Sequence, residues 1–197
     1  MALTKLNNNG IAGVTALPSS IALGDMTLVS SATASSSATI DFTLGDYKEY
    51  QFYFVNIHPA SSSKFSVNFS VDSGSNYNVT KTNTIVNVQH DEANSYAEMA
   101  YAGNDDLAQS TAFASITAGS TGTDNDSNLG GYLKLFNPSS TTFVKHFIVA
   151  ANHSAGAATN YSFMAGYGNT TSALTNIRFK MSSGNIDAGT ILMYGIN

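Results

Sequence analysis

Hydrophobic and polar residues alternate with a period of two along most of the chain. The clearest run is KFSVNFSV, residues 64–71. Successive side chains of a β-strand point to opposite faces, so this run predicts a strand with one buried and one solvated face. We expect the buried face to consist of Phe65, Val67, Phe69 and Val71, and the solvated face of Ser66, Asn68 and Ser70.

A second run, YKEYQFYFVNIH at residues 47–58, carries aromatic side chains on both faces. A strand that is apolar on both sides is typical of the interior of a sheet, so we expect a central strand here. Pro59 should end it, because proline cannot donate a hydrogen bond to a neighbouring strand. The alternation assigns Tyr50, Phe52, Phe54 and Asn56 to one face and Gln51, Tyr53, Val55 and Ile57 to the other.

Shorter runs predict further strands, separated by turn sequences rich in Asn, Pro, Ser and Gly. These strands are expected at residues 26–34, 38–44, 84–90, 131–137, 142–151, 160–168, 174–182 and 189–196. Two stretches break the pattern: the Ala-rich 91–116 predicts either a short helix or a strand with a long loop, and 117–131 predicts a Gly/Ser/Asp loop. The fold class is therefore all-β, an antiparallel, jelly-roll-like β-sandwich.

The stretch SGNIDAGTILMYGIN, residues 183–197, predicts a strand that closes this sandwich. Asp187-Ala188-Gly189 should form a turn or bulge, because glycine reaches backbone angles that other residues avoid. Beyond it, apolar residues alternate on both faces. We expect this strand to pair with one from early in the chain.

Residues 1–25 read differently from the sandwich domain, which we place at 26–197. They mix Asn, Gly and Pro18 with single apolar residues and show no steady period. One interpretation is a frayed terminus. The other is an extended N-terminal arm that inserts apolar side chains into a neighbouring subunit. The candidate partner-binding residues are Leu6, Ile11, Val14, Leu17 and Ile21.

Charged residues make up only 11% of the chain, against about 25% in an average soluble domain, and the net charge is −5. A weakly charged surface repels copies of itself poorly, which suits a protein packed against others. No basic cluster exists to neutralise phosphates, so we expect no nucleic-acid partner. We expect no membrane partner either, because no apolar run approaches the ~18 residues of a membrane helix. The start also lacks the apolar stretch of a signal peptide.

The search for catalytic or metal-binding groups gives little. The chain has no cysteine, and its four histidines lack the spacing of a zinc site, so hydrogen-bonded or solvated histidines are expected. The acidic pairs Asp91-Glu92 and Asp105-Asp106 lie in polar loops, and we expect neither to be catalytic. Asp124, Asp126 and Asn128 have the spacing that opens a calcium loop, but the required Gly and Glu are replaced by leucines. A looser calcium site there remains an open alternative; no other cofactor is expected.

Four stretches together resemble virion proteins of marine tailed bacteriophages: MTLVSSATASSSATIDF, YKEYQFYFVNIHPAS, LKLFNPSSTTFVKHFIV and AGYGNTTSALTNIRFKMSSGNIDAGTILMYGI. The likeness covers roughly residues 26–196 and carries no catalytic motif. Its most specific part is the last strand, in which the matching residues are Gly184, Asp187, Gly189, Thr190, Ile191, Tyr194, Gly195 and Ile196.

The resemblance implies a non-enzymatic β-sandwich component of a virion, either a tail- or fibre-associated module or a capsid decoration protein. Its expected partners are other virion proteins and copies of itself, with a trimer as the favoured stoichiometry. The alternative function is a carbohydrate-binding or depolymerising module that acts on host-surface glycan. The absence of Trp, the usual sugar platform, counts against that alternative.

Overall fold

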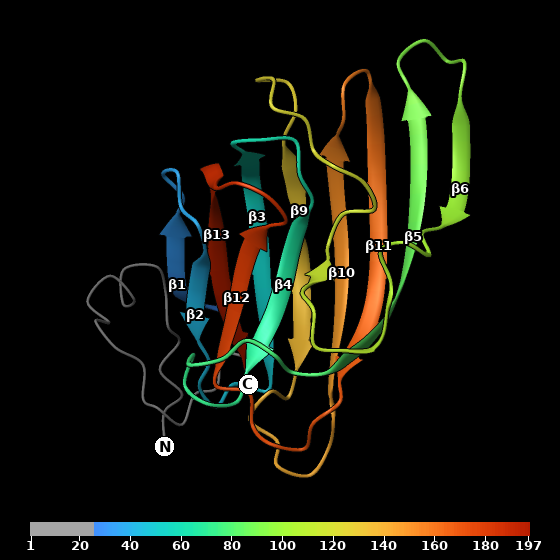
Figure 1. The fold of residues 1–197 in the computed structure, drawn as a ribbon. Coiled ribbons are helices and arrows are strands. Elements are labelled where there is room, and N and C mark those ends of the chain that lie inside the picture. Colours follow the sequence, from blue (N-terminus) through green and yellow to red (C-terminus); the bar gives the residue numbers. More distant parts are fainter. Residues whose placement is uncertain (1–25) are drawn as a thin grey trace, which may run out of the picture.

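The computed structural model describes residues 26–197, which form thirteen strands in two antiparallel sheets and contain no helix (Figure 1). The nine-stranded large sheet has the order β1-β13-β3-β9-β10-β11-β5-β6, and β7 also pairs with β5. Its strands are β1 (Thr27–Thr33), β3 (Glu49–Pro59), β5 (Lys81–Asp91), β6 (Ala97–Tyr101), β7 (Leu107–Ser110), β9 (Leu129–Phe136), β10 (Lys145–Ser154), β11 (Ala158–Gly168) and β13 (Ile186–Ile196). The small sheet has the order β2-β12-β4-β8 and comprises β2 (Ile40–Thr43), β4 (Phe65–Ser70), β8 (Ala114–Ser115) and β12 (Asn176–Met181).

The small sheet packs face to face on the large one, so the predicted β-sandwich is confirmed (Figure 1). The division is uneven, with nine strands against four. The segment between β6 and β9 covers inner-face strands of the large sheet. Leu107 and Ala118 pack against the core, and the Ala118 amide donates to the buried Ser162 hydroxyl on β11. Of the two alternatives for residues 91–116, strands rather than a helix are observed.

Strands from the two ends of the described chain interlock. β13 lies between β1 and β3, and β12 lies between β2 and β4. The bulge predicted at Asp187-Ala188-Gly189 is confirmed, because the β13–β3 register shifts on both sides of Ala188. Gly189 has φ 113°, and a Cβ there would lie 2.5 Å from the carbonyl oxygen of Asn56. The expected pairing of this strand with an early one is confirmed as well.

An aromatic cluster joins the two sheets. The Phe179 ring of β12 lies 5.4 Å from Phe52 and 5.4 Å from Phe54, both on β3 of the large sheet. Within the small sheet it lies 5.7 Å from Phe65 and 6.4 Å from Phe42. All five side chains are buried. Tilted and edge-to-face aromatic pairs stabilise a core beyond their buried area, so this cluster strengthens the contact between the layers.

Strand β3 is central, as predicted, but its alternation breaks at Asn56. That residue has φ 52° and is exposed, and the pairing of β3 with β9 shifts between Phe54 and Ile57. The extra residue rotates the rest of the strand, so Ile57 joins Phe54 on the buried face. The assignment of Asn56 to the Phe54 face and of Ile57 to the opposite face is therefore wrong.

In β4 the prediction is correct for the buried face up to Phe69 and wrong for the solvated face. Phe65, Val67 and Phe69 are buried, whereas Val71 lies beyond the strand and is exposed. The residues expected in solvent, Ser66, Asn68 and Ser70, are also buried. Loops cover them: the Asn68 side-chain amide donates to the backbone oxygens of Tyr77 (2.7 Å) and Thr111 (3.0 Å). Small polar side chains are therefore compatible with burial here because the loops supply hydrogen-bond partners.

Replacing Phe69 by Ala should lower the free energy of unfolding by about 3–5 kcal/mol, as expected for an enclosed Phe→Ala site. Phe69 is buried and its ring lies 5.4 Å from Phe147 of β10, so the truncation leaves a cavity between the sheets. Urea unfolding measures the change. Phe143→Ala is the matched control, because Phe143 is 69% exposed and its loss should change stability by less than about 0.5 kcal/mol. Equal effects of the two variants would contradict the core assignment.

Candidate functional site

The residues proposed from sequence as a partner-binding arm, Leu6, Ile11, Val14, Leu17 and Ile21, lie outside the described residues. The possible calcium loop, in contrast, is described. Asp124 and Asp126 are exposed, and their backbone oxygens, not their carboxylates, contact His58 (3.3 Å) and Ser154 (2.8 Å). Within residues 26–197, no group of three His, Cys, Asp or Glu side chains is placed to hold a metal ion.

The acidic pair Asp105-Asp106 is divided between two different partners. Asp105 forms an ion pair with Lys64, and Asp106 accepts a hydrogen bond of 2.6 Å from the Tyr101 hydroxyl. In the other pair, Asp91 accepts hydrogen bonds from the amides of Ser95 and Tyr96 and so closes the β5–β6 turn. The Ser95 hydroxyl is the main cause of the lowered pKa of Asp91. These contacts give Asp91, Asp105 and Asp106 structural roles.

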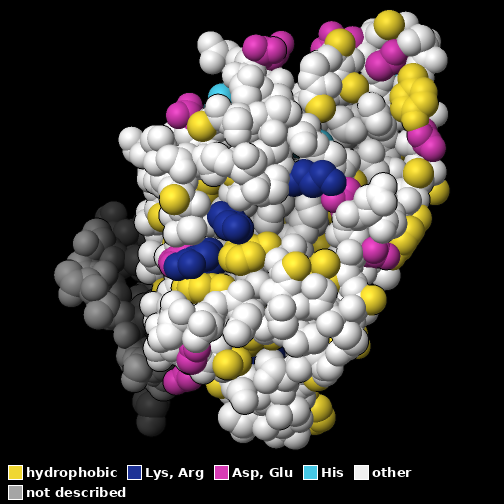
Figure 2. Space-filling model, viewed as in Figure 1, with side chains coloured by type: hydrophobic (Ala, Val, Ile, Leu, Met, Phe, Trp, Pro, Cys, Tyr) yellow, Lys and Arg dark blue, Asp and Glu magenta, His cyan; other side chains and the backbone are white. Residues whose placement is uncertain are grey.

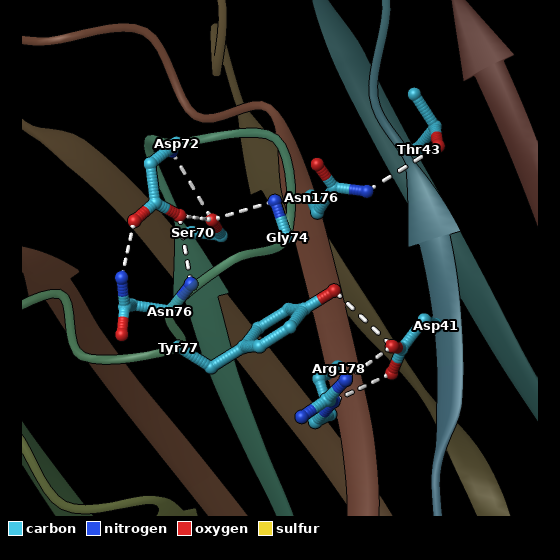
Figure 3. A network of polar contacts seen from close by, with 9 residues as sticks. All are labelled: Asp41, Thr43, Ser70, Asp72, Gly74, Asn76, Tyr77, Asn176 and Arg178. Atoms are coloured by element: carbon cyan, nitrogen blue, oxygen red, sulfur yellow. Dashed lines mark hydrogen bonds and ion pairs between the residues drawn. The ribbon is translucent and has the colours of Figure 1, made fainter.

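A polar network lies on the outer face of the small sheet (Figure 3). Arg178 of β12 makes a two-pronged ion pair with Asp41 of β2, at 2.8 and 2.6 Å, and its guanidinium lies 3.9 Å from the centre of the Tyr77 ring. The Tyr77 hydroxyl donates to the same carboxylate at 3.2 Å. Nearby, hydrogen bonds from Ser70 and Asn76 lower the pKa of Asp72 to about 2. The network fixes the 72–77 turn against the sheet.

Beside this network is an open cleft of about 430 Å³. Figure 2 shows Lys and Arg side chains gathered over the small sheet. Lys64 and Lys180 line the cleft. The Lys180 ammonium lies 4.6 Å from the centre of the Phe113 ring. Hydroxyl groups of Ser66, Ser115 and Ser182 complete the lining, together with Asp105 and Asp106. The cleft thus combines hydrogen-bond donors and acceptors with one aromatic ring.

Two lysines are buried on the inner face of the large sheet. The Lys81 ammonium donates to the Asn68 side-chain oxygen (2.6 Å) and to the Val79 carbonyl (2.7 Å). The Lys145 ammonium donates to three backbone carbonyls, the nearest being that of Phe143 at 2.6 Å. Burial disfavours the charged form, and it lowers the pKa of Lys81 to about 7 and that of Lys145 in the same direction. Both ammonium groups hold loops onto the sheet by capping backbone carbonyls.

His153 on β10 is buried, and neither ring nitrogen has a hydrogen-bond partner among the described residues. Desolvation lowers its pKa to about 4, so the ring is neutral at physiological pH. The expectation that the histidines are hydrogen-bonded or solvated is therefore wrong for His153. The side chain of Asn83 on β5 is likewise buried without a described partner. The inner face of β10, β11 and β5 is thus partly polar.

The outer face of the large sheet, by contrast, is apolar over most of its strands. The alternation places these side chains there: Leu192 and Tyr194 of β13, Tyr53 and Val55 of β3, Tyr132 of β9, Ile148 of β10, Tyr161 and Phe163 of β11, Val86 and Val88 of β5, and Met99 and Tyr101 of β6. Several are among the most exposed large apolar side chains of residues 26–197. Glu49 and Lys134, on the same face, lie 3.9 Å apart. This face offers a large contact surface of low charge.

The period-two pattern already contained the signal for the buried lysines. Lys81 lies two and four residues before Asn83 and Ile85, and Lys145 lies two and four residues before Phe147 and Val149. Each lysine therefore shares a strand face with buried residues. The sequence also indicated the apolar outer face of the large sheet, because apolar residues occur at both alternating positions of β5 and β11. Neither signal identifies the loops that cover one face and leave the other open.

No protein-family model matches the chain, and no curated protein matches it either. Residues 26–197 contain no helix long and apolar enough to cross a membrane.

Replacing Lys81 by Met should flatten the pH dependence of stability. Folded Lys81 loses its proton near pH 7, whereas in the unfolded chain the pKa is 10.5. Between these values the unfolded chain binds more protons, so the free energy of unfolding of the native protein rises with pH. Urea unfolding at several pH values from 7 to 9 checks this. Lys134→Met, at a partly exposed position, is the control and should keep the native slope. An unchanged slope in Lys81→Met would show that Lys81 is not the source.

Proposed function

We propose that this protein is a non-enzymatic structural component of a bacteriophage virion. It serves either as a tail- or fibre-associated module or as a capsid decoration protein, and it assembles through its sheet surfaces and its N-terminal arm. The observation that carries the proposal is the apolar outer face of the large sheet. The resemblance of residues 26–196 to virion proteins of tailed phages supports the proposal that the partner of this face is part of a virion.

The physical reason lies in the large sheet itself. An antiparallel sheet in a sandwich usually buries one face and solvates the other. Here the inner face packs on the small sheet and the loops, and the outer face presents mostly Tyr, Phe, Val and Met side chains, with Glu49 and Lys134 as a charged pair. Extended exposed apolar patches of this kind mark contact surfaces with other proteins. A virion protein, which functions while packed against its neighbours, has such a contact.

A second candidate function is binding of host-surface glycan, favoured by the cleft on the small sheet. Its serine hydroxyls, Lys180 and Asp106 supply both donors and acceptors, and Phe113 supplies an aromatic ring. Saccharides present hydroxyl groups and apolar faces, which this combination matches. The cleft lies on the outer face of the small sheet, away from the apolar outer face of the large sheet. Both functions are therefore compatible with one orientation of the protein in a virion.

Deleting residues 1–22 should leave a soluble protein that unfolds cooperatively but no longer enters phage particles. The described residues already form both sheets, so we expect the core to fold without the deleted segment. Each apolar side chain that the arm buries in a partner contributes roughly 1.5–3 kcal/mol, so loss of several should abolish attachment. Purified particles from infections complemented with native or truncated protein are compared by mass spectrometry. Normal incorporation of the truncated chain would reduce the arm to a frayed end.

The cleft is tested with purified host polysaccharide. Under the structural proposal, incubation should leave the polysaccharide chain length unchanged, because each cleft carboxylate already has a structural partner. Size-exclusion chromatography of the glycan measures this. Cleavage that disappears in an Asp105→Asn, Asp106→Asn double variant would contradict a non-enzymatic role.

Under the glycan-binding candidate, titration calorimetry should detect binding that is lost in Phe113→Ala and retained in Phe143→Ala, which removes an exposed ring elsewhere.

A further inference from the structure

Six side chains form a regular grid on the outer face of the large sheet, at its β6 edge. Cross-strand pairing places Tyr161, Val88 and Met99 in one row and Phe163, Val86 and Tyr101 in the next. The three strands that carry them, β11, β5 and β6, are neighbours in the sheet. These six residues are called the grid patch below.

The grid patch is highly exposed for its composition. Met99 is 75% exposed, Tyr101 55% and Phe163 44%. With aromatic side chains burying about 150–250 Å² each on full burial, the patch presents roughly 500 Å² of largely apolar surface. A standard protein–protein interface buries about 800 Å² on each partner. The grid patch with its immediate border is therefore large enough to form the centre of a stable interface.

The border of the grid patch consists of small or polar residues and is almost free of charge. Tyr161 lies opposite Asn152 of β10 and beside Thr159 of its own strand. Phe163 lies opposite Ala150 of β10 and beside Ala165 of its own strand. Thr84 borders the patch along β5 below Val86, and His90 borders it above Val88. A carboxylate at the margin, Asp106, accepts the Tyr101 hydroxyl hydrogen bond. A strongly charged partner would find few opposite charges to pair with here.

We propose that a second copy of this chain covers the grid patch, with the two patches packed face to face about a twofold axis. A copy presents the same apolar centre and the same uncharged border, so the contact buries no unpaired charge on either side. The low charge of the whole chain, −5 over 197 residues, keeps the repulsion between copies small. The pairing rests on the proposed structural role and names the partner of the outer face.

The full-length protein tests this directly by sedimentation velocity over a range of concentrations. The native chain should sediment with twice its mass of 20.7 kDa. Phe163→Lys and Met99→Lys each place a charge inside the contact and should sediment as single chains. Both positions are exposed in the described structure, so the variants should keep the native circular dichroism. Phe143→Lys puts the same charge at an exposed ring outside the large sheet's strands and should leave the pair intact.

A disulfide test reports the symmetry. The chain contains no cysteine, so a single Val88→Cys substitution introduces the only thiol. In a face-to-face pair centred on β5, the two thiols approach each other and mild oxidation should give a covalent dimer. A native protein that stays monomeric, a trimer, or a pair that survives both lysine substitutions would overturn the twofold pairing. If the protein is monomeric but still enters phage particles, the dimer proposal fails and the virion proposal holds. If the protein is dimeric but absent from particles, the virion proposal fails and the dimer proposal holds.

Discussion

The contact on which the fold depends is the packing of Phe179 against rings from both sheets. Phe52 and Phe54 reach it from the large sheet, and Phe42 and Phe65 reach it from the small one. Phe179 belongs to β12, which also pairs with β2 and β4 and so holds the small sheet together. Both layers and their contact therefore require a strand from late in the chain. Long-range contacts of this kind make folding slow, because large loops must close before the contacts form.

The uneven division of strands explains why the inner face changes character along the large sheet. Where the small sheet covers it, the inner residues are aromatic and aliphatic. Over β5, β10 and β11, where a loop segment provides much of the cover, Lys81, His153 and Asn83 occur. A loop can supply backbone carbonyls to a buried ammonium group, whereas a second sheet uses its carbonyls in its own ladder. The buried lysines thus occur where irregular segments beside the sheet offer free carbonyls, that of Val79 to Lys81 and those of Phe143, Thr170 and Thr171 to Lys145.

The sequence predicted the strands well, because period-two alternation is a local property of the chain. It failed where a residue's surroundings are set by distant segments. Asn68 reads as solvated, yet the backbone oxygens of Tyr77 and Thr111 cover it. Asn56 adopts a positive φ opposite Gly189. The two residues are 133 positions apart, so the sequence around Asn56 does not indicate this contact. The candidate surfaces share this limit: the cleft joins Lys64, Asp105 and Lys180 from three separate segments, which spacing alone cannot bring together.

The pairing of β1 with β13 has a mechanical consequence. The ladder runs from Thr27 opposite Gly195 to Thr33 opposite Thr190, and its hydrogen bonds lie perpendicular to the strands. A tensile force transmitted through residue 26 along the axis of β1 would load the whole ladder at once, in shear. A force directed away from the sheet edge would instead break the bonds one after another, beginning at Thr27. The strength of any attachment made through the first 25 residues is therefore set by the direction of pull.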